Sequence, residues 1–266
     1  MSDAAFVGSI PDLYERYLGP MLFEPYARDL ARRFEGFEGD LLETAAGTGR
    51  VTRALAKAAP RARILATDLN QPMLDTAAGL TAAANVEWRQ ADAQALPFEG
   101  ASFDAVVCQF GVMFFPDKAA GFSQARRVLR PGGRFVFNVW DDIAANEISQ
   151  IVGEAVAGLF PKDPPRFLER TPFGYHDRAT IAAALAAAGF AAPQFDVVRL
   201  QMRSPSAADA AVGLCTGTPL RGEIEARDPE GLDAATEAAC AALTEAFGGG
   251  EIVGWGQAVV VSAAAT

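Results

Sequence analysis

The 266-residue chain is long enough for one large α/β domain with insertions, or for a domain with a small lid, and half of its residues are hydrophobic. Its formal net charge of −10 argues against nucleic acid or an anionic membrane surface as a partner, because either would need a basic face. The three cysteines, Cys108, Cys215 and Cys240, lack metal-binding spacing, and no apolar run reaches the roughly 18 residues of a membrane span, so we expect a reduced cytoplasmic setting.

Two helices are expected near the N-terminus, after residues 1–9, which look disordered. They cover Ile10 to Leu18 and Met21 to Phe34, and Gly19-Pro20 is expected to break the chain between them. The second helix carries an apolar stripe at helical spacing, which should lie on a sheet.

Residues 41–50 follow the pattern of a strand, a glycine turn and the start of a helix. Gly47 and Gly49 allow a tight turn against which a ligand can lie, because glycine has no Cβ. A dinucleotide fingerprint would need a third glycine at Thr52, where a pyrophosphate docks on the helix. Glu43 is also a poor neighbour for pyrophosphate but a good one for a cation. The turn therefore favours S-adenosylmethionine, which carries an ammonium group and a sulfonium and has no phosphate.

Between residues 40 and 140 expected strands alternate with expected helices. The strands are 40–45, 62–67, 86–90, 103–109 and 133–140, and the helices are 49–59, 71–83 and 118–129. This alternation predicts a parallel sheet with helices on both faces, whose ligands lie across the carboxyl ends of the strands. Four polar residues fall at or just past these ends: Glu43, Asp68, Asp92 and Gln109. We therefore expect these residues to form one site.

In these segments the sequence resembles the class I S-adenosylmethionine-dependent methyltransferases. The resemblance rests on five segments in order: 43–49, 64–70, 90–98, 103–111 and 127–136. It is closest to the group that contains the ubiquinone and menaquinone biosynthesis methyltransferases. It implies an α/β fold with a Rossmann-like, doubly wound, mostly parallel seven-stranded sheet, whose last strand is antiparallel, and with helical lid insertions.

The resemblance also implies which residues hold the cofactor. Asp68 would accept both ribose hydroxyls, and Asp92 would accept the adenine amino group while the Ala93 N–H meets a ring nitrogen. Glu43 would oppose the ammonium group, and the Gln109 carbonyl would accept one of its protons. The other expected cofactor contacts are Ala45, Gly47, Gly49, Leu69 and Met73, with Tyr14 and Tyr17 from the leading helix. Turn or helix capping by the two aspartates, and simple packing of the two tyrosines, remain alternatives.

An apolar wall for the methyl acceptor is expected after the fourth and fifth strands. Its candidate residues are Phe110, Met113, Phe114 and Trp140. Core packing is the alternative for Phe114 or for its neighbour Phe115. His176, the only histidine, precedes a helix and is a candidate general base because its reference pKa is about 6.5, although a cap or rim role is the alternative. No metal constellation is visible, so we expect no metal.

Beyond Trp140 we expect a helix over 148–160, a proline-rich loop, a helix over 178–188, a strand over 194–202, helices around 206–214 and 232–247, and a closing strand over 251–262. The expected layout is an N-terminal helical cap (1–36), a cofactor-binding α/β core (37–141 and 177–203), a lid insertion (142–176), a second helical insertion (204–250), and a closing strand with its tail (251–266). Insertions at the carboxyl edge of a sheet are where a substrate lid would lie.

The sequence thus predicts an enzyme that moves the methyl group of S-adenosylmethionine to a small, fairly apolar metabolite by in-line displacement. The acceptor atom can be oxygen, carbon or nitrogen, and the sequence indicates no oligomeric state. One alternative is a protein of the same fold that binds S-adenosylmethionine as a regulator, or that catalyses another reaction. An NAD(P)-dependent oxidoreductase is the second alternative, and Thr52 at the third glycine position disfavours it.

Overall fold

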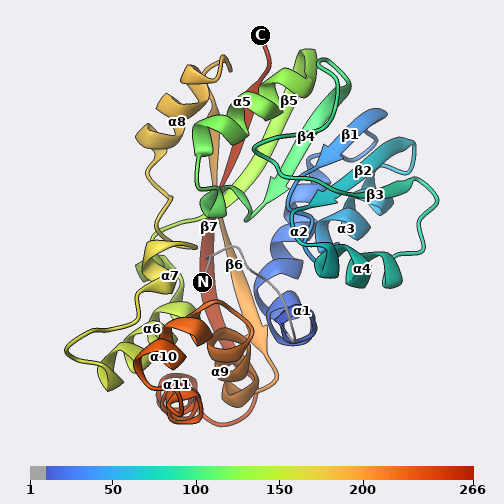
Figure 1. Ribbon diagram of the computed structural model, residues 1–266. Helices are drawn as coiled ribbons and strands as arrows, with labels where there is room; N and C mark the ends of the chain where they lie inside the picture. The colour runs from blue at the N-terminus through green and yellow to red at the C-terminus, as the bar shows by residue number, and fades with distance from the viewer. Residues whose placement is uncertain (1–9) are drawn as a thin grey trace. The chain divides into compact units, whose positions relative to one another are not determined.

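A computed structural model describes residues 10–266, which form two compact units (Figure 1). The helical unit comprises the described residues up to Tyr26, Asp141–Gly174 and Arg199–Gln257. The sheet unit comprises Ala27–Trp140, Tyr175–Val198 and Ala258–Thr266. The disorder expected for residues 1–9 lies outside the described residues.

The described elements follow one another much as the alternation of the sequence predicts. The strands are β1 (Gly39–Glu43), β2 (Ala62–Asp68), β3 (Val86–Gln90), β4 (Phe103–Gln109), β5 (Leu129–Trp140), β6 (Gln194–Ser204) and β7 (Ile252–Ala264). The α-helices are α1 (Ile10–Leu13), α2 (Glu24–Arg32), α3 (Arg50–Ala58), α4 (Gln71–Gly79), α5 (Lys118–Val128), α6 (Glu147–Leu159), α7 (Phe167–Arg170), α8 (Arg178–Ala187), α9 (Ala207–Thr216), α10 (Leu220–Arg227) and α11 (Leu232–Phe247). The others are a π-helix, η1 (Tyr14–Phe23), and two 3-10 helices, η2 (Val112–Phe114) and η3 (Ile143–Ala145).

The sheet has seven strands in the order β3-β2-β1-β4-β5-β7-β6. β1 pairs in parallel with β2 and β4, β2 with β3, and β4 with β5. β7 instead runs antiparallel to β5, from Arg134 opposite Ala264 to Trp140 opposite Ala258. The doubly wound sheet with an antiparallel last strand is therefore confirmed, and the carboxyl ends of β1 to β5 share one edge.

Opposite faces of the sheet pack against different helices (Figure 1). On one face Phe34, in the turn just after α2, and Leu55 of α3 join a buried cluster with Val107 and Val136 from the middle of the sheet. On the other face the ring of Phe122 in α5 contacts those of Phe135 and Phe137, with centroids 5.9 and 5.5 Å away. Successive residues of β5 thus alternate between two buried faces, which explains why that strand is almost continuously hydrophobic.

The expected break at Gly19-Pro20 is wrong, because the chain stays helical from α1 through η1 into α2. η1 is a π-helix that contains Pro20, and at its end the Glu24 N–H donates to the Gly19 carbonyl, five residues back. Proline lacks the N–H that an α-helix uses at each interior position. A wider helical turn accommodates this loss without ending the helix.

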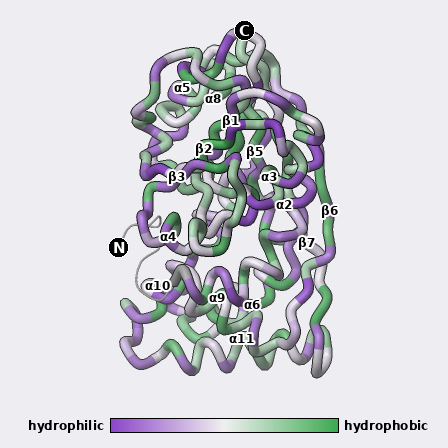
Figure 2. Tube along the Cα trace, turned by 90° about the vertical axis from the view of Figure 1, so that its right-hand side faces the viewer, coloured by the Kyte–Doolittle hydropathy of each residue, from purple (hydrophilic) through white to green (hydrophobic). Residues whose placement is uncertain are grey.

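In the helical unit α11 packs against α6 and α9, and α9 packs against η1. Two short helices, α7 and α10, were not expected from the sequence; each is too short for its hydrophobic period to show. β6, which contributes to both units, mixes hydrophobic and charged residues along its length (Figure 2). No described helix is both long and apolar enough to cross a membrane.

The three cysteines carry free thiols. Cys108 lies in β4 and Cys215 in α9, and both are buried, whereas Cys240 in α11 is half-buried. Burial raises the pKa of the Cys108 and Cys215 thiols to about 12.

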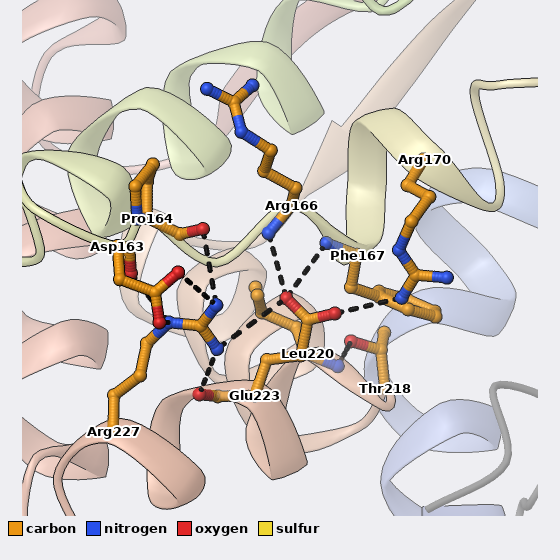
Figure 3. A network of polar contacts seen from close by, with 9 residues as sticks. All are labelled: Asp163, Pro164, Arg166, Phe167, Arg170, Thr218, Leu220, Glu223 and Arg227. Carbon is orange, nitrogen blue, oxygen red and sulfur yellow. Dashed lines mark hydrogen bonds and ion pairs between the residues drawn. The ribbon is translucent and has the colours of Figure 1, made fainter.

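Glu223 of α10 joins the two insertions within the helical unit (Figure 3). One of its carboxylate oxygens accepts hydrogen bonds from the backbone N–H groups of Arg166 and Phe167, at 2.8 and 3.2 Å. The other accepts from Arg170 Nη2 at 2.9 Å. Glu223 thereby satisfies N–H groups at the start of α7, which the short helix cannot pair internally.

Arg227, one turn further along α10, fixes the proline-rich loop of the first insertion (Figure 3). Its guanidinium donates to the Asp163 carbonyl at 2.6 Å and to the Asp163 carboxylate at 3.2 Å. The same side chain donates to the Glu223 carbonyl at 2.8 Å. One face of α10 therefore holds both ends of the segment 163–170.

We expect Glu223→Ala to lower the free energy of unfolding by about 1–3 kcal/mol, because it leaves the Arg166 and Phe167 N–H groups without their acceptor. Thermal unfolding followed by circular dichroism measures this. Glu225→Ala is the matched control, since the ion pair that the described structure gives Glu225 is with Arg221 in the same helix, with N···O 2.7 Å. Equal melting temperatures for the two variants would contradict a special role for Glu223.

Candidate functional site

The glycine turn between β1 and α3 has three residues in the left-handed region. The φ angles are 55° at Ala45, 57° at Gly47 and 80° at Gly49. A Cβ on Gly49 would come within 2.9 Å of the Trp88 ring, so this position needs glycine for space as well as for conformation. A Cβ on Gly47 would contact nothing within 4 Å. The turn is thus close-packed on the Gly49 side and open at Gly47, where a ligand can lie against the backbone.

Glu43, the last residue of β1, is buried with 1% of its surface exposed. Its Oε2 atom has no hydrogen-bond partner among residues 10–266. Burial raises the pKa of this carboxyl to about 8, with the Thr52 hydroxyl opposing the rise and the nearby charge of Asp68 adding to it. A buried carboxyl whose oxygen has no partner is suited to a cationic ligand group, because a cation would offset the cost of ionising it. The chemistry of this site therefore fits the ammonium group of S-adenosylmethionine.

Asp68, the last residue of β2, connects its strand to the glycine turn. Asp68 Oδ2 accepts a hydrogen bond from the Gly47 N–H at 2.9 Å, and Oδ1 accepts from the Asn70 N–H at 2.8 Å. Burial raises the pKa of this carboxyl, and these N–H donors oppose the rise. Asp68 therefore stabilises the two turns through these N–H groups, which is the alternative role expected from the sequence. Oδ1 also accepts from Asn70 Nδ2 at 3.3 Å, so Oδ2 is the oxygen with acceptor capacity left for a ribose hydroxyl, and the ribose contact stays a prediction.

The expected adenine segment lies at the ends of β2 and β3. Asp92 Oδ1 accepts from the Gln94 N–H at 2.8 Å, which is the local turn expected as the alternative. Asp92 and Ala93 are half-buried. Leu69 is 49% exposed whereas Met73 is 3% exposed, so of these two hydrophobic residues Leu69 presents the larger open surface to a ligand.

The expected acceptor wall contains a close aromatic pair. Phe110, just after β4, has φ of 50°, and its ring is stacked on that of Trp140, with centroids 3.8 Å apart and planes 8° from parallel. Phe110, Met113 and Trp140 are buried, and Phe114 is half-buried. A Cβ on Gly121 of α5 would lie 2.6 Å from the Phe115 ring, so Phe115 is the one of the two adjacent phenylalanines that packs closely on a helix. The contact of this wall with an acceptor stays a prediction.

Tyr14 and Tyr17 lie in η1 of the helical unit. The Tyr14 ring is stacked on that of Phe23, with centroids 4.6 Å apart. The Arg16 guanidinium lies over the Tyr17 ring, 5.1 Å from its centroid. Both rings therefore have packing partners inside the helical unit, and their contact with a cofactor is untested.

His176 and Tyr175 precede α8 in the sheet unit. The residue that caps α8 is Asp177, whose carboxylate accepts from the Thr180 N–H at 2.7 Å, so His176 is not the cap. Burial raises the pKa of the Tyr175 hydroxyl to about 12, which disfavours it as a base near neutral pH. His176 stays a prediction as general base.

Asn138 is a buried polar residue at the carboxyl end of β5 that the sequence interpretation missed. It is 0% exposed and lies in register with Gln109 of β4. Asn138 Oδ1 accepts a hydrogen bond from the Phe110 N–H at 3.0 Å. The available signal was one amide in an otherwise apolar strand segment, 135–140, level with a predicted site residue on the next strand.

The strand ends thus bring Glu43, Asp68 and Gln109 to one edge of the sheet, with Asp92 just past the end of β3. Within the described part of the chain no group of three His, Cys, Asp or Glu residues could hold a metal ion.

Comparison with known proteins agrees with this geometry. Residues 42–137 match the model of a methyltransferase domain. A demethylmenaquinone methyltransferase of Thermus thermophilus is 32% identical over 163 residues, which are 56% of this chain and 73% of that protein. A demethylmenaquinone methyltransferase of Deinococcus radiodurans is 40% identical over 98 residues, which are 36% of this chain and only 41% of that protein.

Among solved structures, the [4+2]-cyclase SpnF superimposes with a TM-score of 0.58 at 17% identity, over 99% of this chain and 96% of that one. At this identity the likeness concerns the fold alone. The match to the methyltransferase domain family and the identity with the Thermus relative also identify the family. Together they show that this chain belongs to the class I S-adenosylmethionine-dependent methyltransferases, in the group of the ubiquinone and menaquinone biosynthesis enzymes.

Proposed function

We propose that this chain transfers the methyl group of S-adenosylmethionine to a small, fairly apolar metabolite. The observation that carries the proposal is Glu43, a buried carboxyl with an oxygen that has no partner, at the strand end beside an open glycine turn. The cofactor supplies a methyl group activated by a positively charged sulfur. The chain needs only to bind it, align an acceptor with the methyl group and exclude water, and such positioning can supply about 7–11 kcal/mol of barrier reduction.

Each strand end has a separate task in this proposal. Glu43 holds the ammonium group, Asp68 holds the ribose and Leu69 lies against the adenine. The stacked rings of Phe110 and Trp140 form an apolar wall, which suits a reaction in which positive charge disappears. The net charge of −10 disfavours nucleic acid as the acceptor.

The relatives' names support an aromatic or quinone-like acceptor. The Thermus and Deinococcus proteins are named for demethylmenaquinone, a quinone. The apolar character of the residues after β4 and at the end of β5 agrees with an acceptor of that kind.

A second candidate is a reaction other than methyl transfer on the same fold. SpnF, whose fold this chain shares, is named as a [4+2]-cyclase. The cofactor half of the site would look the same in both cases, so turnover is the observable that separates them.

Incubation with methyl-labelled S-adenosylmethionine and a panel of phenols, quinols and amines tests the proposal. Repeated transfer of label to one of these acceptors supports methyl transfer. Tight cofactor binding with no product from any of them supports the second candidate.

Glu43→Gln should stabilise the protein and weaken cofactor binding. The folded-state pKa of about 8 lies above the ordinary value of 4.5, so between these pH values the unfolded chain ionises Glu43 while the folded chain keeps it protonated. Ionisation in this window favours unfolding, and stability falls as the pH rises through it. The melting temperature of the variant should therefore exceed that of the wild type by a margin that grows from pH 5 to pH 8.

The same carboxyl should make cofactor affinity depend on pH. A cation binds the ionised form, so the affinity of the wild type should rise about tenfold per pH unit up to the pKa. Calorimetry with S-adenosylhomocysteine between pH 5.5 and 7.5 measures this and the accompanying proton release. Glu43→Gln should bind roughly tenfold or more weakly and lose the slope. An equal slope in the variant would assign the proton to another group.

Asp68→Ala should weaken S-adenosylhomocysteine binding at least roughly tenfold, because a hydrogen bond to a charged group contributes about 1.5–3 kcal/mol. Asp68→Asn separates the two roles of this carboxyl, because it keeps an oxygen for the Gly47 N–H but loses the charge. Asp75→Ala on α4, whose side chain is exposed, is the control. Unchanged calorimetric affinity in Asp68→Ala would show that the ribose assignment is wrong.

A further inference from the structure

Asn138 is a polar residue that the fold gives no reason to keep. It lies between Phe137 and Val139 in β5 and is fully buried. Its Nδ2 atom is shut off from solvent and has no hydrogen-bond partner among the described residues. A buried donor without a partner destabilises a protein, and an apolar side chain of the same shape would avoid that cost.

The hydrogen bond that Asn138 Oδ1 accepts from the Phe110 N–H is not needed to satisfy that N–H group. The Phe110 N–H donates to the backbone carbonyl of Asn138 at 3.1 Å as well as to Oδ1 at 3.0 Å. The bond to Oδ1 instead fixes the orientation of the Asn138 side-chain amide. With Oδ1 directed at Phe110, Nδ2 is the branch left for another partner.

The strand register places Asn138 with residues of the cofactor site. Asn138 is level with Gln109, and Glu43 is level with Val107, which lies two residues before Gln109 on the same strand. Aligned residues of parallel strands point to one face, and so do residues two apart. Glu43, Gln109 and Asn138 therefore lie on one face, near the carboxyl ends of three adjacent strands.

Asn138 also shares with Glu43 both its burial and an unpaired side-chain polar atom among the described residues. Each is buried, and each has one polar atom without a partner, an acceptor in Glu43 and a donor in Asn138. The sheet order places β5 on the side of β4 away from β1, so Asn138 lies past the ammonium site, at the strand that ends in Trp140.

We propose that Asn138 Nδ2 is a hydrogen-bond donor kept for the methyl acceptor, and that the atom it binds is an oxygen, as in a hydroxyl, a phenolate or a carbonyl. This rests on the proposed methyl transfer and narrows its acceptor to an oxygen-bearing molecule. Nδ2 is closed off from solvent, so an acceptor oxygen reaches it only when the groups that cover it move apart.

Two substitutions separate donation from its alternatives. Asn138→Leu replaces the amide by an apolar group of similar shape. Asn138→Asp keeps an oxygen for the Phe110 N–H and loses its donor once its carboxyl ionises; because burial raises the pKa of a carboxyl, this variant is assayed from pH 7 to pH 9. Both variants are assayed with the quinol or phenol of the labelled panel that the wild type methylates fastest, and their affinity for S-adenosylhomocysteine is measured by calorimetry.

We expect both variants to lose at least roughly tenfold in kcat/KM for that acceptor, with cofactor affinity unchanged within about twofold. Asn138→Leu should melt no lower than the wild type. Asn146→Leu is the matched control and should melt lower, because the buried Asn146 uses both ends of its amide, with Nδ2 donating to the Asp142 carbonyl at 3.0 Å and Oδ1 accepting from the Gln257 N–H at 3.0 Å.

Four results would overturn the proposal. Wild-type turnover in Asn138→Asp at pH 9, where its carboxyl is ionised, would mean that the side chain acts by holding Phe110. Undiminished turnover in Asn138→Leu would leave the amide without a role, and a lower melting temperature in that variant would make it structural. Absence of turnover in the wild type would refute methyl transfer to these acceptors and the Asn138 assignment with it. An active wild type with active Asn138 variants would refute the Asn138 assignment alone, so the two failures are distinguishable.

Discussion

A carboxyl group taken out of water without a partner is the constraint around which the cofactor edge of the sheet is arranged. Glu43 ends β1 with one oxygen that has no hydrogen-bond partner among residues 10–266, and the charge of Asp68 raises its pKa further. The fold itself gains nothing from this arrangement, since an uncharged residue would be cheaper to bury. A cation from outside the chain removes the cost, so affinity for the ligand and stability of the free protein oppose one another at this one side chain.

Two of the three described non-glycine residues with positive φ lie at the same edge of the sheet, and the third, Ala101, precedes β4. Ala45 follows β1 and Phe110 follows β4, and both are non-glycine residues in the left-handed region. The two strand ends are also in close contact, because a Cβ on Gly111 would lie 2.4 Å from that of Ala45. Such conformations persist where the surrounding packing determines them, and they cluster at sites that hold ligands. Phe110 combines this conformation with a ring stacked on that of Trp140.

The order of strands and helices could be predicted from the sequence because β1, β2, β4 and β5 carry apolar runs and the helices between them have their own period. Three of the polar strand-end residues, Glu43, Asp68 and Gln109, could be found for the same reason: in a parallel sheet the carboxyl ends meet at one edge. Asn138 could not be found in this way, because a single amide in an apolar strand indicates a site only once its neighbour on the adjacent strand, Gln109, is known.

The N-terminal helix and the insertions were harder to predict for other reasons. Gly19-Pro20 normally ends a helix, but packing of η1 against α9 holds the chain in a wider turn. The short helix α7 depends on Glu223, which lies more than fifty residues further along the chain. No local pattern reports a contact of that range.

The unequal burial of the three thiols decides how this protein can be labelled. A thiolate is the species that reacts with maleimides and iodoacetamides, and a thiol with a pKa of about 12 is almost entirely protonated near neutral pH. Cys108 and Cys215 are therefore slow to modify while the chain is folded. A fluorophore or spin label added under mild conditions would attach at Cys240 on α11, so spectroscopy of the helical unit needs no engineered cysteine.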